Sequence, residues 1–489
     1  MSKIGWNIIW GLVITSVFLV LLFIRLDYFS GNSVPAMDVQ ETASPRPPET
    51  WMNIYQQKNK IGVIHRTFSS KDNLIQITET VSMHINTAGV TQAINISTQS
   101  DLNPDMTLSS FNFDLTSSLF RFNAHGQVVK NKLILFTGTP EAQTKNEIAL
   151  KYIPHLSGDI YGAAFHGGLE KDLVRSFSIF DPSTLTNSSI KVTRNADEII
   201  PIMGKRVLTQ KYCADFMGAK NCAWLDKTGE VLKETGILGL SMEKVSEEKA
   251  REGISAQNSI DFTQMASVHV SRKITEPGKL SEIKIKISGL TNPSIHINGD
   301  RQAFKQNVLT ITREKLPTAT LRKIDIPKDI SAFLKPSPLI QSDHPQIKTQ
   351  AQKIVLPSDS PQEKVRKIVN WVNVNVEKKP VLSVPNALEV LKNKVGDCNE
   401  HAVLTAALLR AAGIPAQIET GLVYLHGRFY YHAWNIAYVG KWITVDAVFN
   451  QMPADVTHIR LVRGEGGEQL DLLGFMGKIK LEVISEKND

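Results

Sequence analysis

The first hydrophobic feature of the chain is an uncharged apolar run close to its N-terminus. Ile4–Ile24 reads IGWNIIWGLVITSVFLVLLFI, and as a helix rising about 1.5 Å per residue it spans about 31 Å, the thickness of a hydrocarbon core. Arg25 follows directly, without the small residues of a signal-peptide cleavage site. The pattern predicts an uncleaved transmembrane anchor at residues 1–30 and a proline-rich linker at residues 31–50. The rest of the chain is then expected outside the cytoplasm, most simply facing a bacterial periplasm from the inner membrane.

Between residues 51 and 255 the dominant pattern is an alternation of apolar and polar positions, which is typical of strands. One face, interrupted only by Glu79, carries Ile75, Ile77, Val81, Met83 and Ile85. The pattern predicts a large antiparallel sheet that curls, with turns at His125–Gly126 and Asp226–Gly229. The charge-rich segment 243–253 marks a boundary, and a second, small β domain is expected at residues 256–338.

The periodicity becomes helical within the last predicted domain, residues 339–489. Ser360-Pro361-Gln362-Glu363 is a capping box with proline at the first helical position. Further helices are predicted at residues 386–395 and 398–412, the latter closed by Gly413. Strands are then predicted at residues 417–425, 429–438 and 441–448. The chain as a whole is therefore expected to be α+β, with antiparallel β-rich domains before a mixed C-terminal domain.

Composition narrows the class of protein without naming a function. The 489 residues are 42% hydrophobic and 21% charged, which excludes a disordered or collagen-like chain. The net charge of +7 is spread thinly, with no run of five basic residues, so no nucleic-acid partner is expected. A basic surface facing an anionic membrane or cell wall accounts for this excess more simply.

The three cysteines fall into two groups. Cys213 and Cys222 lie nine residues apart at the ends of strand-like runs, and in an oxidising compartment they form a possible disulfide across a hairpin. The alternative is that both stay unpaired and pack as small hydrophobic residues, and the sequence leaves the choice open. Cys398 lies in another domain and is the odd thiol.

The residues around Cys398 favour a nucleophile. Cys398 opens a predicted helix, and Asp397 before it is suited to cap that helix. Free N–H groups and the helix dipole stabilise a thiolate over a thiol at such a position. The same N–H groups can stabilise an oxyanion after attack on a carbonyl. We therefore expect a lowered thiol pKa, and a nearby imidazole held by an acceptor.

Both partners occur downstream of Cys398. If two strands pair through a loop at residues 438–440, His432 and Asp446 lie directly opposite each other, with Cβ atoms about 5 Å apart. Trp434 and Trp442 share that face and are expected as core or possible pocket-wall residues. The pairing predicts a Cys–His–Asp constellation.

At these residues the chain resembles the transglutaminase-like (papain-related) superfamily. The similar segments are GDCNEHAVLTAALLRAAGIPAQ, YYHAW and KWITVDAVF, within about residues 340–480. The resemblance implies a papain-like α+β domain in which Cys398 is the nucleophile, His432 the base and Asp446 the orienting acid. Ala447 replaces the proline that usually follows the aspartate.

Two other histidines compete with His432 for the role of base. His401 lies three residues after Cys398 and is expected to be solvated or to support the site indirectly, because no orienting carboxylate is evident beside it. His426 precedes a glycine and is expected in a loop. Neither is predicted to act as the base.

Two hypotheses of function follow. The first is a membrane-anchored, extracytoplasmic cysteine acyl-transfer enzyme, a peptidase/amidase or a transglutaminase, that forms a thioester with a protein or peptide substrate. No HExxH, CxxC or EF-hand motif is present, so no cofactor or metal is expected. The alternative is a catalytically inactive envelope binding or scaffold protein that uses its β domains.

Overall fold

The computed structural model describes residues 47–488, except for the residues 88, 119, 139–142, 217–218, 237–238, 255–260, 262–266, 291–294, 318–324, 382 and 466–477. Within these described residues, no helix is both long and apolar enough to cross a membrane. The longest, α6 (Pro361–Asn375), has 15 residues and reaches only about 22 Å. The predicted fold class, which included an N-terminal transmembrane helix, is therefore corrected to a β-rich α+β chain. The predicted anchor, residues 1–30, and most of its linker lie outside the described residues.

The first half of the described chain forms one sheet of 16 strands, antiparallel except for the pair β9–β10. Its strands are β1 (Glu49–Gln56), β2 (Asn59–Lys71), β3 (Leu74–Thr87), β4 (Val90–Leu102), β5 (Leu108–Ser117), β6 (Arg121–Val129), β7 (Lys132–Thr137), β8 (Thr144–Ala149), β9 (His155–Leu156), β10 (Val174–Asp181), β11 (Thr186–Arg194), β12 (Glu198–Ile202), β13 (Lys205–Phe216), β14 (Ala219–Leu225), β15 (Val231–Thr235) and β16 (Leu240–Val245). The short helices η1 (Ser157–Asp159), α2 (Ile160–His166) and α3 (Glu247–Arg251) accompany it.

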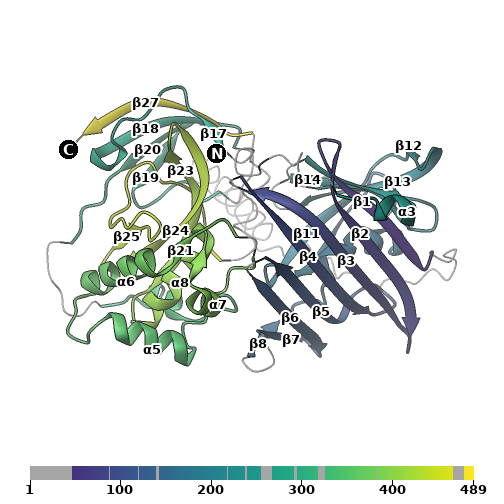
Figure 1. Ribbon diagram of the computed structural model, residues 1–489, viewed down its shortest axis with the longest axis horizontal. Coiled ribbons are helices and arrows are strands. Elements are labelled where there is room, and N and C mark those ends of the chain that lie inside the picture. The colour runs from purple at the N-terminus through teal and green to yellow at the C-terminus, as the bar shows by residue number, and fades with distance from the viewer. Residues whose placement is uncertain are drawn as a thin grey trace, which may run out of the picture. The chain divides into compact units, whose positions relative to one another are not determined.

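The prediction that this sheet curls is confirmed by its core. Strands β3 to β7 and strands β9 and β10 stand toward opposite ends of the strand order, yet their inward residues pack in one cluster. The rings of Phe111 and Phe180 lie 5.2 Å apart across it. Figure 1 shows the long curved strands, from purple to teal. Burial of both ends against each other removes large apolar areas from water.

One of the two predicted turns is confirmed and the other is wrong. Asp226–Gly229 connects β14 to β15, and Asp226 Oδ1 accepts the N–H of Thr228 at 2.8 Å. His125–Gly126 instead lies inside β6. A Cβ on Gly126 would come within 2.6 Å of the Phe111 ring, so the glycine serves close packing and does not form a turn.

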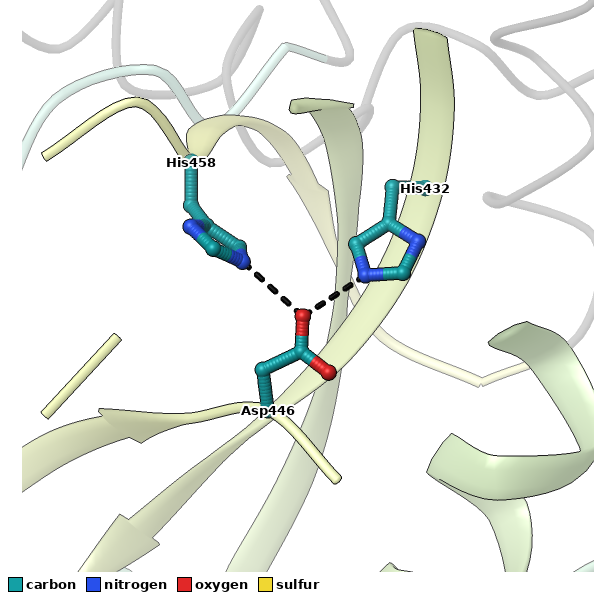
Figure 2. A group of neighbouring side chains, drawn as sticks. All are labelled: His432, Asp446 and His458. Carbon is teal, nitrogen blue, oxygen red and sulfur yellow. Dashed lines mark hydrogen bonds and ion pairs between the residues drawn. The ribbon is translucent and has the colours of Figure 1, made fainter. Parts of the chain in front are cut away.

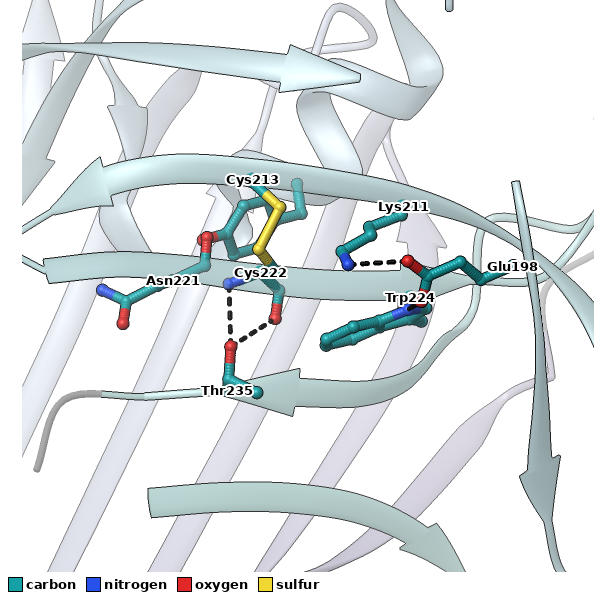
Figure 3. Close-up of a disulfide and its surroundings, with 8 residues drawn as sticks. Glu198, Lys211, Cys213, Asn221, Cys222, Trp224 and Thr235 are labelled. Carbon is teal, nitrogen blue, oxygen red and sulfur yellow. Dashed lines mark hydrogen bonds and ion pairs between the residues drawn. A yellow bond between two sulfur atoms is a disulfide. The ribbon is translucent and has the colours of Figure 1, made fainter. Parts of the chain in front are cut away.

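Cys213 and Cys222 are joined by a disulfide in the structure. They lie directly opposite each other on β13 and β14, and both are buried. Figure 3 shows Thr235 of the next strand against the backbone of Cys222, accepting its N–H at 3.0 Å. Of the two alternatives that the sequence left open, the structure contains the bonded one, which leaves Cys398 as the free cysteine.

The small β segment of the middle of the chain does not stand alone. Its sheet has the order β19-β20-β18-β27, and the edge strand β27 comes from the C-terminus of the chain. Its core is shared with Leu422, Phe429 and Ile459 of the C-terminal domain. The elements are β17 (Val268–His269), η4 (Pro277–Lys279), β18 (Leu280–Ser288), β19 (Gln302–Lys305), β20 (Val308–Thr312) and β27 (Lys480–Asn488). The predicted boundaries at residues 256 and 338 stay predictions. Strand β17 pairs with the C-terminal sheet.

The C-terminal domain packs helices against an antiparallel sheet. Its elements are η5 (Ile330–Leu334), α5 (Pro345–Ile354), α6, β21 (Glu377–Lys378), α7 (Ala387–Asn393), β22 (Val395–Gly396), α8 (Cys398–Ala411), β23 (Ala416–Leu425), β24 (Arg428–Tyr438), β25 (Trp442–Val445) and β26 (Ile459–Arg463). The sheet order is β17-β24-β23-β26, with β25 on β24. One core joins α5, α6, α7 and α8 to β23 and β24. The green elements of Figure 1 show α8 beside β24, the two elements that carry the site.

Candidate active site

Cys398 is placed by a helix start that the sequence specifies in detail. Asp397 Oδ1 accepts the N–H of Asn399 at 2.8 Å, and Glu400 Oε2 accepts the N–H of Asp397 at 2.9 Å. Together these bonds form a capping box. Gly396 is required for it, because a Cβ there would lie 2.2 Å from the Cβ of Glu400. The predicted cap is confirmed, and it fixes Cys398 as the first residue of α8.

The thiol of Cys398 is held in its neutral form in the resting structure. Burial raises its pKa well above that of a free thiol, and the negative charge of Asp397 raises it further. The backbone N–H of Ala433 bonds to the thiol and opposes these effects without overcoming them. The prediction of a lowered thiol pKa was wrong, because burial and a neighbouring carboxylate outweigh the helix start. Cys398 therefore needs a base at the moment of reaction.

Strands β24 and β25 bring His432 and Asp446 together, although in a different register from the one expected. Tyr438 pairs with Trp442, so the turn lies one residue later than predicted, at residues 439–441. The whole pairing moves by two positions, which leaves every side chain on its predicted face. The diagonal geometry still lets His432 Nε2 bond to Asp446 Oδ2 at 2.7 Å.

Asp446 is a fixed, buried anion. Its Oδ1 accepts the N–H groups of Val448 at 2.6 Å and Phe449 at 3.1 Å. Asn373 of α6 donates to the carbonyls of Ala447 and Val448, which secures the loop that makes these bonds. Burial raises the pKa of Asp446, but the neighbouring histidines outweigh it and hold that pKa far below its usual range. The replacement of the usual proline by Ala447 leaves this anchoring intact.

The cysteine and histidine elements meet through α8 and β24. Asn435 is fully buried, and its Nδ2 donates to the carbonyl of Ala402 at 2.9 Å, tying the strand to the helix. The Ala433 N–H contacts the thiol of Cys398. His432 precedes Ala433, and its Nε2 is engaged by Asp446, so Nδ1 is the ring nitrogen left for the cysteine. The structure thus places Cys398 on α8, His432 on the adjoining strand β24 and Asp446 at the end of β25.

The two predicted tryptophans separate in the structure. The ring of Trp434 is stacked 5.9 Å from that of His432, and its Nε1 donates to Glu419 at 2.9 Å. It therefore forms one wall beside the histidine. Trp442 contacts Phe333 and Tyr438 instead. We assign Trp442 to packing.

The competing histidines do not bond to Asp446. His401 is buried, so the expectation that it is solvated was wrong. Its Nδ1 bonds to the backbone carbonyl of Asp397 at 2.6 Å. Burial lowers the pKa of His401, which keeps its ring neutral. His426 lies exposed in the turn between β23 and β24, as predicted. His401 is therefore a packing residue of α8 beneath the site.

Sequence reasoning missed a second histidine at the site. Figure 2 shows His458 and His432 converging on Asp446 from two sides. His458 Nε2 lies 2.9 Å from Asp446 Oδ2, and its Nδ1 lies 3.4 Å from Asp455 Oδ1. Its only signal in the sequence is a histidine at the start of the apolar run HIRLV. Nothing in that pattern indicates contact with Asp446, because the contact depends on where β26 lies in the sheet.

The same three residues are a donor set that a metal can use. Ligand atoms of His432, Asp446 and His458 lie within 4.8 Å of one another, and two histidines with a carboxylate suit Zn²⁺. In this structure the Nε2–H groups of His432 and His458 both donate to Asp446 Oδ2. A cation would have to displace both protons, and the three residues are nearly or fully buried. Hydrogen bonding accounts for the geometry.

A comparison of sequences identifies the domain. Residues 348–447 match the sequence profile of the transglutaminase-like superfamily. The C-terminal domain is transglutaminase-like. The match spans Cys398, His432 and Asp446, so the resemblance seen in the motifs extends over residues 348–447. No curated protein matches the chain.

Solved structures resemble parts of the chain loosely. A proposed cysteine protease from Cytophaga hutchinsonii is 21% identical, with a TM-score of 0.26, over 43% of this chain and 83% of its own. A β-barrel-like protein from Brucella abortus is 13% identical, with a TM-score of 0.32, over 42% and 98%. The periplasmic domain of TgpA from Pseudomonas aeruginosa, bound to ethylmercury, is 19% identical, with a TM-score of 0.23, over 35% and 73%. These likenesses carry no argument beyond the family match.

The buried pair of His458 and Asp446 in the transglutaminase-like domain makes stability depend on pH. Burial lowers the pKa of His458, but Asp446 and Asp455 outweigh it and raise that pKa from 6.5 to about 9. Because the folded value exceeds the unfolded one, the stabilisation is complete below pH 6.5 and is lost as the pH rises through 9. At 1.36 kcal/mol per pKa unit it amounts to at most about 3 kcal/mol.

We expect the free energy of unfolding in urea to fall between pH 6.5 and 9 by about 3 kcal/mol more in the unaltered protein than in His458→Gln. The variant lacks the titrating imidazole, so other groups cancel in the comparison. Equal slopes for the two proteins over this range would contradict a cationic His458.

Proposed function

We propose that the transglutaminase-like domain is a cysteine acyl-transfer enzyme acting on an amide of a protein or peptide. The thiol of Cys398 attacks the carbonyl carbon while His432 Nδ1 takes the thiol proton. The tetrahedral intermediate collapses, the C–N bond breaks, and His432 gives its proton to the leaving amine. Water or an amine then attacks the thioester, His432 removes a proton from it, and that proton returns to the thiolate. Asp446 holds the imidazole throughout.

One observation carries this proposal. The thiol of Cys398 contacts the backbone N–H of Ala433, and the residue before it, His432, is bonded to a buried aspartate at 2.7 Å. A neutral, partly buried thiol held against the residue that follows an oriented imidazole suits general-base catalysis. The bond from Asp446 fixes the imidazole of His432 through Nε2, which leaves Nδ1 for the cysteine.

A cavity near the start of α8, with both acidic and apolar residues in its lining, is a candidate site for part of the substrate. It has a volume of about 290 Å³ and is bordered by Asp397 and Asn399, the two neighbours of Cys398. Its walls include the apolar side chains of Val403 and Ile418. Ser383, also in the wall, donates to Glu400 at 2.5 Å, which fixes the polar rim. We propose that this cavity holds the side chain next to the reacting carbonyl.

We further propose that the enzyme works outside the cytoplasm. The support is the buried disulfide between Cys213 and Cys222, because structural disulfides form and persist in oxidising compartments. Such a location limits the substrates to envelope or exported proteins and peptides. The disulfide also leaves Cys398 as the free thiol of the chain, so a thiol reagent reports on Cys398.

The proposed function is tested with p-nitrophenyl acetate, an acyl donor that requires no knowledge of the natural substrate. After acid quenching and digestion, mass spectrometry should find an acetyl group on the peptide that contains Cys398. Cys398→Ala reports acetylation of other side chains. Addition of glycinamide then separates the two reactions: acetylglycinamide as product indicates transamidation, and acetate alone indicates hydrolysis.

The same measurement tests the inactive-scaffold alternative. If Cys398 stays unacetylated and p-nitrophenol is released no faster than by Cys398→Ala, the acyl-transfer proposal fails, because an acylated thiol must either accumulate or turn over. The β domains would then be left as the functional part of the chain.

A further inference from the structure

His458 is a buried histidine with a polar partner at each ring nitrogen. Its side chain is fully buried, and each ring nitrogen faces a carboxylate, Asp446 at 2.9 Å and Asp455 at 3.4 Å. Its backbone carbonyl accepts a bond from Arg301 at 3.2 Å, and its ring packs edge-on against Trp434. A histidine between two carboxylates uses both nitrogens as donors, so it carries a positive charge.

The two histidines share a single oxygen. Both Nε2 atoms bond to Asp446 Oδ2, while Oδ1 is taken by the N–H groups of Val448 and Phe449. Four donors leave the carboxylate no freedom to rotate away from His432. The arrangement also places a permanent cation within 4.8 Å of the His432 ring nitrogen.

We propose that His458 is a positioning residue of this active site, a buried imidazolium that shares Asp446 with His432, holds that carboxylate toward the His432 ring and sets the pH range in which the site works. This inference rests on the proposed function of Cys398 and His432. It assigns to a residue outside the Cys–His–Asp constellation the control of the pH range in which that constellation works.

The physical reason is charge compensation in a buried site. A carboxylate beside an imidazole attracts a proton to the ring, and a second positive charge on the same carboxylate weakens that attraction. The groups that face His458 are Asp446, Asp455 and His432, with Arg301 at its backbone carbonyl. Burial opposes the charge, yet the two carboxylates raise the pKa of His458 to about 9, so the cation persists through the neutral range. Its charge opposes a further positive charge beside the same carboxylate.

The test is the rate at which iodoacetamide alkylates Cys398 as a function of pH. The rate should rise along an acid limb to a plateau. In His458→Gln the amide still donates to Asp446 but carries no charge, so the limb should move to higher pH by about one unit. His155→Gln is the matched control, because His155 is buried and bonded but lies in the large sheet; its limb should not move.

The outcomes separate the two proposals. If Cys398 in the unaltered protein reacts no faster than in urea, the proposed function has failed. Suppose instead that Cys398 is activated in the unaltered protein. If the acid limb of the alkylation rate then keeps its pH in His458→Gln and only the plateau rate falls, His458 is structural and the present inference has failed.

A second measurement does not depend on the variant folding. Nitrogen-15 NMR of histidine-labelled, unaltered protein at pH 7.5 should show both ring nitrogens of His458 protonated. A single protonated nitrogen would overturn the inference. So would stoichiometric zinc in the purified protein, since a metal in place of the protons would leave no imidazolium.

Discussion

Cys398→Ala is expected to lower the hydrolysis of p-nitrophenyl acetate to the background rate, a loss of about 10³-fold or more. The thiol is the only group in the proposed mechanism that forms a bond to the substrate. Cys398→Ser should be nearly as inactive, because a buried hydroxyl is far harder to deprotonate than the thiol, whose own pKa is already raised by burial. Initial rates, with folding matched by circular dichroism, measure both losses.

The serine variant is the informative control for the alanine variant. It preserves the volume and the capping box of α8, so a loss shared by both variants reflects chemistry and not helix packing. Retention of more than a tenth of the rate by Cys398→Ala would show that another side chain is the nucleophile.

His432→Ala is expected to lower the same rate by about 10²- to 10⁴-fold, while His401→Ala costs far less. Both side chains are buried, so both variants lose packing, but only His432 bonds to the aspartate. His401 instead bonds to the carbonyl of Asp397, within its own helix. Equal losses in the two variants, at matched folding, would mean that the base has been misassigned.

Local signals in the sequence predicted most of the site. The predicted capping box at Ser360 and the predicted cap at Asp397 are both present, and Glu400 completes a capping box at Asp397 that was not predicted. His432 still meets Asp446 although the predicted turn was one residue off, because the strand pairing moved by two positions and both side chains kept their face. Short-range patterns of this kind need no knowledge of the rest of the fold.

The features that sequence reasoning missed all depend on distant packing. His458 reaches Asp446 only because β26 pairs with β23. The small sheet is completed by β27, from the far end of the chain. Gly126 reads as a turn residue, although the Phe111 ring on the neighbouring strand β5 is what requires a glycine there. The raised thiol pKa of Cys398 follows from burial, which the sequence of α8 alone does not reveal.

The central claim, that His432 activates Cys398, is tested most directly by the ratio of two alkylation rates. Cys398 is the free cysteine, so iodoacetamide reports on it alone. At pH 7.5 the folded, unaltered protein should be alkylated at least about tenfold faster than folded His432→Ala, because only the former has a base to take the thiol proton. Equal rates in the two folded proteins would contradict the account.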